Sequence, residues 1–353
     1  MESFQKPVLV TGATGYVAAH TIKQLLEQGF KVRGTVRSVA KKERNQFLYN
    51  LVPEKSSNLE LVEADLLKPE SWLSVVEGCD YILHIASPIP ANPPKDENLL
   101  IKPAVEGTLN VLKAAVKKGV KKVVITSSCL TRMIGNQGKI ITTETWADES
   151  QCDAYSKSKI RAEKAAWKFY EENKGKIEIS YVVPSFVLGP VLNAVDGSSE
   201  SFMKMVMTGK MPGTPNISVG IVDVRNVAEA HIQVMLLPNS SGKQYIITCK
   251  TMWFKDVAKT VRDEFGKYGY KVTKGSIPNC MVSLAALFSK QAKSAKAILG
   301  TFWEYDTELT KRELKINWIE PEQMLRDMGY SLIKLGVVPN RIDKYELHNV
   351  VKK

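Results

Sequence analysis

The first half of the chain alternates short apolar runs with segments in which hydrophobic residues recur at helical spacing. The apolar runs have the length of buried strands, which we expect at 7–10, 31–36, 59–64, 81–85, 122–126 and 177–183. Helices are expected at 16–28, 40–51, 69–77, 98–118 and 154–170. Such alternation is typical of a parallel sheet with right-handed crossovers. The sequence therefore predicts an α/β fold with a Rossmann-type, doubly wound parallel sheet.

The pattern loosens beyond Pro184, where glycine and proline cluster in loops. Short strands and amphipathic helices are expected at 219–224, 244–248, 253–265, 281–299 and 322–335. We predict a Rossmann-type domain over 1–187, which also receives about 218–237, and a smaller C-terminal lobe over 188–353. Large apolar side chains at helical spacing in the lobe are expected in its core: Phe202, Met205, Leu284, Leu287 and Phe288.

Composition and charge exclude several classes of function. Hydrophobic residues make up 44% and charged residues 24% of the 353 residues, an ordinary balance for a folded protein. The net charge of +12 includes lysine doublets that are spread along the chain without interleaved aromatic residues. This arrangement predicts a solvated basic surface and no nucleic-acid partner.

The remaining composition predicts a cytoplasmic protein without a membrane partner. No apolar run approaches the roughly 20 residues that span a bilayer, and the chain opens without an apolar leader. The five scattered cysteines form no Cys-x-x-Cys pair, so we expect free thiols. The four histidines lack ligand spacing, so no metal is expected.

The first strand leads into the glycine turn Thr-Gly-Ala-Thr-Gly, followed by a helix. Gly12 permits the tight exit from the strand, Gly15 lets the backbone approach a phosphate, and Ala18 keeps the helix close to the sheet. The free amides at the helix N-terminus favour an anion there. A plain strand-turn-helix would need the same glycines for geometry alone. The flanking strand and helix favour a dinucleotide site instead.

The second strand indicates which dinucleotide binds. NAD enzymes usually carry an acid about 20 residues beyond the turn, whereas residues 31–42 contain no Asp or Glu. Arg37, just past the strand, is our first candidate for binding a 2′-phosphate, and Lys41 is the second. Arg33 falls within the strand, where it could simply be a solvated charge. The sequence thus predicts NADPH/NADP as the cofactor.

Tyr155 and Lys159 lie one helical turn apart on the expected helix 154–170. An ammonium beside the phenol would stabilise the phenolate and lower the pKa of Tyr155 toward neutrality. Tyr155 could then give a proton to a carbonyl oxygen as hydride reaches the carbon. A serine is also needed to orient the carbonyl, and Ser127 and Ser128 follow the fifth strand, at the sheet edge where such folds place ligands.

These motifs resemble the extended short-chain dehydrogenase/reductases, in the branch of dihydroflavonol, cinnamoyl-CoA and yeast-type methylglyoxal/aldehyde reductases. The resemblance spans V-T-G-A-T-G-Y-V-A, G-C-D-Y-I-L-H-I-A-S-P, Y-S-K-S-K, A-E-K-A-A-W-K-F and V-V-P-S-F-V-L-G-P. It implies that Ser128 is the catalytic serine, with Tyr155 and Lys159, and that the C-terminal lobe binds the substrate. The cofactor residues it implies, together with those above, are Gly12, Thr14, Gly15, Tyr16, Val17, Arg37, Lys41, Asp65, Leu66, Ala86, Tyr155, Lys159, Pro184, Val187 and Ser199.

Two departures from the branch bear on the substrate. Met133 stands where dihydroflavonol reductases have an asparagine that helps hold the flavonoid, and the cinnamoyl-CoA reductase pattern around the tyrosine is absent. We therefore expect an NADPH-dependent carbonyl reductase of a small aldehyde or ketone, with Met133 in the substrate pocket, acting as a monomer or homodimer. An NAD-dependent nucleotide-sugar epimerase/dehydratase and a non-catalytic NADP-sensing protein are the alternatives.

Overall fold

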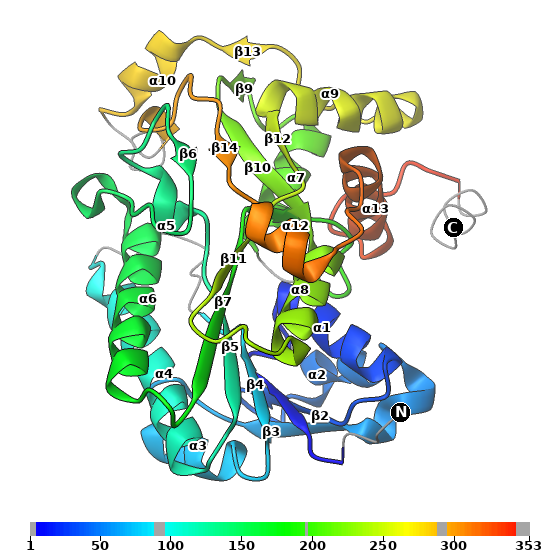
Figure 1. Cartoon of the computed structure of the whole chain (residues 1–353). Helices are drawn as coiled ribbons and strands as arrows, with labels where there is room; N and C mark the ends of the chain where they lie inside the picture. The colour runs from blue at the N-terminus through cyan, green and yellow to red at the C-terminus, as the bar shows by residue number, and fades with distance from the viewer. Residues whose placement is uncertain (1–4, 88–95, 195–196, 288–294, 344–353) are drawn as a thin grey trace.

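A large parallel sheet forms the body of the molecule (Figure 1). The computed structural model describes residues 5–87, 96–194, 197–287 and 295–343. The seven strands are paired in the order β11-β7-β5-β4-β1-β2-β3, and every neighbouring pair is parallel. These strands are β1 Val8–Val10, β2 Val32–Val36, β3 Leu59–Glu63, β4 Tyr81–His84, β5 Lys122–Thr126, β7 Glu178–Pro184 and β11 Gln244–Ile247.

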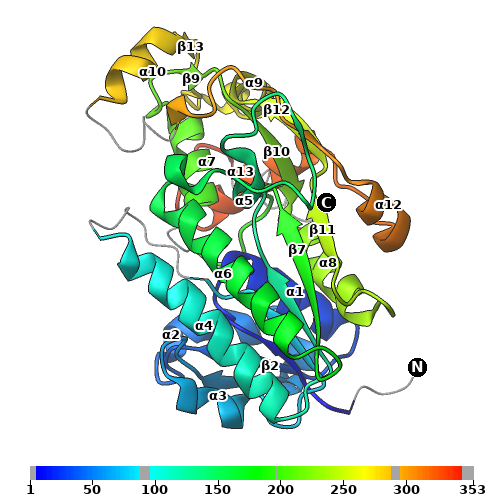
Figure 2. The ribbon, with the colours of Figure 1, turned by 60° about the vertical axis from the view of Figure 1, so that its left-hand side comes forward.

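Helices cover both faces of this sheet (Figures 1 and 2). On one face α1 contacts α8, and on the other α4 contacts both α3 and α6. Alternate residues of a strand point to opposite faces, so Val8 and Val10 pack with the first layer and Leu9 with the second. Because both layers are apolar, such a strand is a continuous apolar run. These helices are α1 Tyr16–Glu27, α2 Lys42–Tyr49, α3 Pro69–Val75, α4 Asn98–Lys117, α6 Ala154–Glu172 and α8 Val224–Leu236.

A smaller lobe lies beyond the carboxyl ends of the large sheet's strands (Figure 1). Its sheet has the order β12-β10-β8, with β10 parallel to β8 and antiparallel to β12. Its helices share a third apolar core, in which α13 packs so closely on α9 that a Cβ at Gly329 would lie 2.3 Å from the Phe265 ring. These elements are β8 Phe186–Leu188, β10 Ser218–Asp223, β12 Lys250–Trp253, α7 Ser198–Thr208, α9 Phe254–Phe265 and α13 Pro321–Lys334.

Short elements complete the described fold. β6 pairs with β14, and β9 pairs with β13. These strands and the short helices are α5 Leu130–Met133, α10 Asn279–Ala285, α12 Glu308–Leu314, β6 Ile140–Ile141, β9 Thr214–Pro215, β13 Ser276–Ile277, β14 Glu304–Tyr305 and the 3₁₀ helices η1 Pro53–Asn58, η2 Glu149–Gln151 and η3 Gly266–Tyr268.

The expected fold class is confirmed, and every strand and helix expected in the first half is present with small differences at its ends. The second half was harder to predict. The strand β11 joins the edge of the large sheet, and α8 packs on α1, whereas β10 pairs within the lobe. The pattern missed α7, α12, β8 and β12, because short elements carry too few residues to establish a period.

The expected core of the lobe is partly wrong. Phe202 is buried, but Met205 is 40% exposed, Leu284 63% and Leu287 71%. The expected helix 281–299 begins instead as the short α10, which buries Val282 and leaves its other faces in solvent. Helical spacing aligns apolar residues but does not supply a surface for them to pack against. Phe288 lies outside the described residues.

Candidate active site

The glycine turn and the end of β4 are held together at the carboxyl edge of the large sheet. The Thr11 hydroxyl oxygen accepts hydrogen bonds from the backbone amides of Ile85 (3.0 Å) and Ala86 (2.9 Å). Gly12 has φ of 70°, and a Cβ there would lie 3.0 Å from the Ala86 Cβ. Only glycine fits this position, both for its backbone conformation and for the approach of Ala86. The structure thus places Gly12 and Ala86, two of the expected cofactor residues, side by side.

The helix α1 starts at this turn with its amides available. Gly15 is the exposed N-cap, and no side chain in the described part of the chain caps the helix. Uncapped N-terminal amides at the positive end of the helix dipole form an anion site. Val17, in the first turn, packs against the core. The local geometry therefore suits a pyrophosphate.

A small pocket lies beside this turn, where α1 contacts the start of the lobe. The Tyr16 hydroxyl donates to the Gly189 carbonyl (2.7 Å), and His20 Nε2 lies 2.8 Å from the Pro190 carbonyl. The pocket is lined by Thr14, Gly15, Tyr16, Ala19, Phe47, Leu192 and Asn193. The sequence analysis missed Leu192 and Asn193, because no motif marks a loop that reaches the turn only through tertiary folding.

The basic residues after β2 differ in their freedom to bind a ligand. Arg33 donates to the Glu60 carboxylate (2.8 Å) and to the carbonyls of Val75 and Glu77, so its role is structural. Arg37 and Lys41 are exposed and form no ion pair within the described residues. Their guanidinium and ammonium groups are therefore free to bind an anion.

The ends of β3, β7 and β8 carry further expected cofactor residues. Asp65 is exposed, and its carboxylate accepts from the Leu67 amide (2.9 Å). Leu66 packs against Gly107 of α4, where a Cβ would lie 2.8 Å away. Val187 is half-buried on β8, and Ser199 is buried in the first turn of α7. The hydrogen bonds that Asp65 forms among the described residues stay within its own segment and do not reach the glycine turn.

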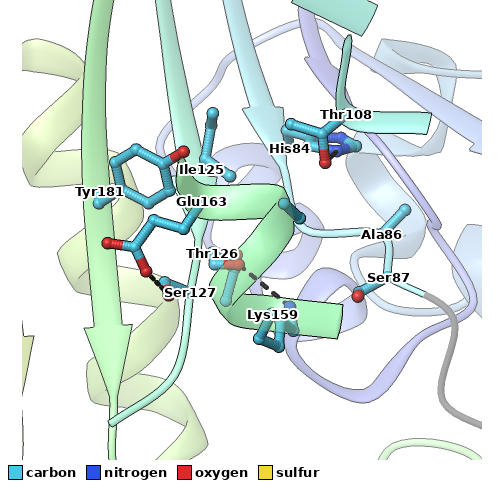
Figure 3. Close-up of a pocket in the computed structure, with 11 residues that line it drawn as sticks. His84, Ala86, Ser87, Thr108, Ile125, Thr126, Ser127, Lys159, Glu163 and Tyr181 are labelled. Carbon is cyan, nitrogen blue, oxygen red and sulfur yellow. Dashed lines mark hydrogen bonds between the residues drawn. The ribbon is translucent and has the colours of Figure 1, made fainter. Parts of the chain in front are cut away.

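The helix α6 brings the tyrosine and lysine to the end of β5. The Asp153 carboxylate accepts from the Ser156 amide (2.8 Å) and starts the helix two residues before Tyr155. Lys159 is buried, and its ammonium donates to the Thr126 carbonyl (3.2 Å; Figure 3). Because Thr126 ends the strand that leads into the two serines, this hydrogen bond fixes the helix relative to them.

The structure distinguishes the two serines. Ser127 is buried and donates its hydroxyl to the Glu163 carboxylate (Figure 3). Ser128 is half-buried, and its hydroxyl oxygen accepts from the Leu130 amide (3.2 Å), which leaves its proton free. The Cys129 amide donates to the carbonyl of Pro184 (2.9 Å), the last residue of β7. Ser128 is therefore the serine of the pair that can donate to a ligand.

Burial shifts the pKa of both Tyr155 and Lys159. It raises the pKa of Tyr155 to about 12, and the Asp153 carboxylate adds to this effect. Burial also lowers the pKa of Lys159 to about 8, against the opposing effect of Glu163. The expected lowering of the Tyr155 pKa is therefore not observed in this structure, because the burial of the phenol dominates and the Lys159 ammonium is directed at the Thr126 carbonyl.

Two buried histidines flank Lys159. His231 Nδ1 lies 2.7 Å from the Val227 carbonyl and must carry the proton, so the Thr126 hydroxyl donates to Nε2 (2.7 Å). Burial lowers the pKa of His231 to about 4 and that of His84 to about 3, and the Lys159 charge lowers both further. Both imidazoles are therefore neutral at physiological pH and add no charge to the site.

Arg132 and Glu163 form a fully buried ion pair next to these residues. Arg132 also donates to Gln244 of β11, and the Trp146 ring lies 4.7 Å from its guanidinium carbon. The sequence analysis missed this pair, because an arginine and a glutamate 31 residues apart carry no motif of a shared site. Their meeting depends on how α5 packs against α6.

Met133 lies on the same short helix and is only 4% exposed. Its sulfur accepts a hydrogen bond from the Tyr305 hydroxyl (3.5 Å), and it belongs to the core that includes Ile141 and Trp303. The side chain therefore packs in this core, and its contact with a substrate stays a prediction. In the described part of the chain, no helix has the length and hydrophobicity to cross a bilayer, and no cluster of potential metal ligands is present.

Residues 8–248 match the model of the NAD dependent epimerase/dehydratase family. Tetraketide alpha-pyrone reductase 2 of Arabidopsis thaliana is 32% identical over 275 residues, which cover 74% of this chain and 84% of that protein. Cinnamoyl-CoA reductase CAD2 of Medicago truncatula is 34% identical over 267 residues, which cover 72% and 80%. The crystal structure of yeast methylglyoxal/isovaleraldehyde reductase Gre2 complexed with NADPH is 25% identical, with a TM-score of 0.77 over 95% of this chain and 100% of that one.

The fold, the glycine turn and the comparisons together define an oxidoreductase. The chain belongs to the NAD dependent epimerase/dehydratase family, in the extended short-chain branch of dihydroflavonol, cinnamoyl-CoA and Gre2-type reductases. The expected family is thereby confirmed.

The buried ion pair leads to a prediction about stability. Arg132→Met should lower the free energy of unfolding by about 3–5 kcal/mol, because it leaves the buried Glu163 carboxylate without its counter-charge. Combining it with Glu163→Gln should restore most of that loss, since neither charge then remains buried. Chemical denaturation of the wild type, the single variant and the double variant measures both effects. A double variant less stable than Arg132→Met would contradict this account.

Proposed function

We propose that this enzyme reduces the carbonyl group of a small aldehyde or ketone with NADPH. Tyr155 gives the proton, Ser128 orients the carbonyl and Lys159 supports the tyrosine. The observation that carries this proposal is the Lys159–Thr126 hydrogen bond, which brings the helix of Tyr155 to the strand end of Ser128. The relatives named above are reductases, and the Gre2 structure contains NADPH, which supports the same chemistry here.

The residues around the glycine turn fit this cofactor. The uncapped amides of α1 suit the pyrophosphate, and Gly12 leaves room for its approach. Arg37 and Lys41 are exposed after β2 and can bind a 2′-phosphate, which an acid at this position would repel. NADPH, when bound, supplies the hydride. The protein supplies binding, orientation and the proton.

Tyr155 holds its proton at neutral pH, as an ordinary phenol does, and burial raises its pKa further, to about 12. This is the form that a reduction needs. As hydride adds to the carbonyl carbon, the carbonyl oxygen takes the phenolic proton and an alcohol results. The Lys159 ammonium then stabilises the phenolate that is left, and it can also bind the ribose hydroxyls of the cofactor. The free hydroxyl proton of Ser128 holds the carbonyl oxygen in place.

The chemistry of the Met133 side chain supports a compact, apolar substrate. Met133 is held by Tyr305 and presents no amide or hydroxyl in the region where an asparagine would contact a flavonoid. A buried substrate hydroxyl without a partner costs more than a lost methylene contact. Polyhydroxylated carbonyls should therefore be poor substrates, and small aromatic or aliphatic carbonyls good ones.

The family also includes epimerases and dehydratases, and the fold could serve a sensor that binds NADP without chemistry. Nucleotide-sugar epimerases retain NAD, and free basic groups after β2 argue against that cofactor. A sensor has no need of the Tyr155, Lys159 and Ser128 set. Net consumption of NADPH with an aldehyde separates the reductase from both.

The first prediction concerns the proton donor. Tyr155→Phe should reduce turnover by about 10²–10⁴-fold, the usual contribution of a positioned general acid, and keep the fold and NADPH binding. Tyr170→Phe on the same helix is the matched control, since its hydroxyl contacts only Ser241 among the described hydrogen bonds. Steady-state kinetics and cofactor fluorescence test this, and near-wild-type turnover of Tyr155→Phe would refute the mechanism.

The second prediction concerns cofactor choice. A charged hydrogen bond contributes roughly 1.5–3 kcal/mol, so Arg37→Ala should weaken NADPH binding by about 10–100-fold and leave NADH nearly unchanged. Arg326→Ala, which removes an exposed guanidinium from α13, controls for the loss of net charge. Titration with both cofactors measures the effect. Equal losses for NADPH and NADH would show that Arg37 does not contact the 2′-phosphate.

The third prediction concerns the substrate. We expect kcat/KM to be higher for small aromatic or aliphatic aldehydes and ketones than for dihydroflavonols, because Met133 offers no polar partner. NADPH oxidation against a panel of both classes, with the alcohol identified as product, is the measurement. A clear preference for a dihydroflavonol would overturn the substrate proposal while leaving the reductase chemistry intact.

A further inference from the structure

The buried ion pair Arg132–Glu163 lies one helical turn from Lys159. The two guanidinium nitrogens reach both oxygens of the Glu163 carboxylate, one at 3.3 Å and the other at shorter range. Hydroxyls of Ser127 and Thr131 contact the same carboxylate. Such bidentate pairing, with further hydroxyl donors, fixes both the position and the charge of a buried carboxylate.

Stability alone does not account for this arrangement. A buried ion pair usually gives no more stability than apolar side chains of similar volume, because desolvation of the charges cancels their attraction. The contacts of Arg132 instead join three elements, since it lies on α5, pairs with α6 and donates to Gln244 on β11. The guanidinium thus holds Glu163 against the strand end that carries the serines.

Glu163 and Lys159 line one small cavity, of about 20 Å³, at the end of β5 (Figure 3). Three titratable groups line this cavity with Lys159: His84 on β4, Tyr181 on β7 and Glu163 on its own helix. His231 on α8 is close enough for the Lys159 charge to lower its pKa, Tyr155 lies one helical turn from Lys159 on α6, and Arg132 on α5 pairs with Glu163. The two histidines are neutral at physiological pH because burial lowers the pKa of each. The two tyrosines are neutral as ordinary phenols are, and burial raises their pKa further. Glu163 therefore supplies the negative charge behind the lysine.

We propose that Arg132 and Glu163 are positioning residues for the reaction: Glu163 keeps Lys159 charged in its buried site, and Arg132 holds Glu163 where it can do so. This inference rests on the proposed function, in which the Lys159 ammonium supports the tyrosine. Ser127, the residue before Ser128, also contributes, because its hydroxyl donates to the same Glu163 carboxylate. The motif residues Tyr155, Lys159 and Ser128 would thus depend on a charge that the motif does not contain.

The charge of Lys159 should make kcat/KM for reduction depend on pH. Burial lowers the pKa of Lys159 to about 8, and the Glu163 charge opposes that change. Lysine loses its charge as the pH rises through its pKa, so kcat/KM for reduction should fall on the alkaline side. Without the Glu163 charge the fall should begin at lower pH.

The experiment compares pH profiles of kcat/KM. The double variant Arg132→Met with Glu163→Gln removes both charges and keeps similar side-chain volumes, so it should fold. Its alkaline limb should move to lower pH than that of the wild type. Glu163 lines the cavity of Lys159 and Arg132 does not, so the loss of the carboxylate should outweigh the loss of the guanidinium. A folded double variant whose limb coincides with that of the wild type overturns the proposal. If the double variant does not fold, Glu163→Gln alone should show the same downward shift, and its absence is equally decisive against the proposal.

Gln244→Met is the matched control, because it removes a partner of Arg132 and changes no charge. Its alkaline limb should stay at the wild-type position, and a shift as large as that of the double variant would assign the effect to packing and overturn the proposal. The pH dependence of NADPH affinity, measured by fluorescence, follows Lys159 without turnover. Failure of the wild type to reduce any aldehyde would refute the proposed function, while this binding profile still tests the role of Glu163.

Discussion

The hydrogen bond from the Lys159 ammonium to the Thr126 carbonyl is the contact on which the arrangement of the site depends. It crosses from the helix α6 to the end of β5 and joins residues 33 positions apart in the chain. A buried ammonium needs such a partner, because an unpaired charge away from water is costly. The same contact therefore satisfies the lysine and sets the distance between Tyr155 and Ser128. The need to satisfy a buried ammonium thus fixes the position of the Tyr155 helix relative to Ser128.

Burial then determines the protonation states. The phenol of Tyr155 is kept protonated and the ammonium of Lys159 is made easier to deprotonate, because low-dielectric surroundings disfavour charge in both groups. Neutral histidines on both sides of Lys159 satisfy local hydrogen bonds without adding repulsion. In the proposed reaction Tyr155 donates its proton, so a protonated phenol suits reduction, whereas oxidation would start from the phenolate.

Polar contacts from α1 join the first half of the molecule to the start of the lobe. Tyr16 and His20 of α1 reach the carbonyls of Gly189 and Pro190, where the chain enters the lobe. The helix whose N-terminus suits the cofactor is thus joined to the loop that leads to the lobe. Gly189 has φ of 118° and a Cβ there would lie 2.9 Å from the Asp223 carboxylate, so this junction requires glycine. These contacts join the glycine turn of α1 to the lobe that we propose binds the substrate.

Local patterns in the sequence were enough to predict the features that are themselves local. Apolar runs and helical spacing predicted the strands and helices of the first half, and the glycine pattern predicted the turn that leads into α1. The four-residue spacing predicted that Tyr155 and Lys159 lie on one helix. The tertiary structure alone decided which serine keeps a free proton, that Met133 is buried, that β11 completes the large sheet and that Arg132 meets Glu163. Each of these depends on contacts between residues far apart in the chain. A periodic pattern shows which face of an element is apolar, but it does not show which other element that face will contact.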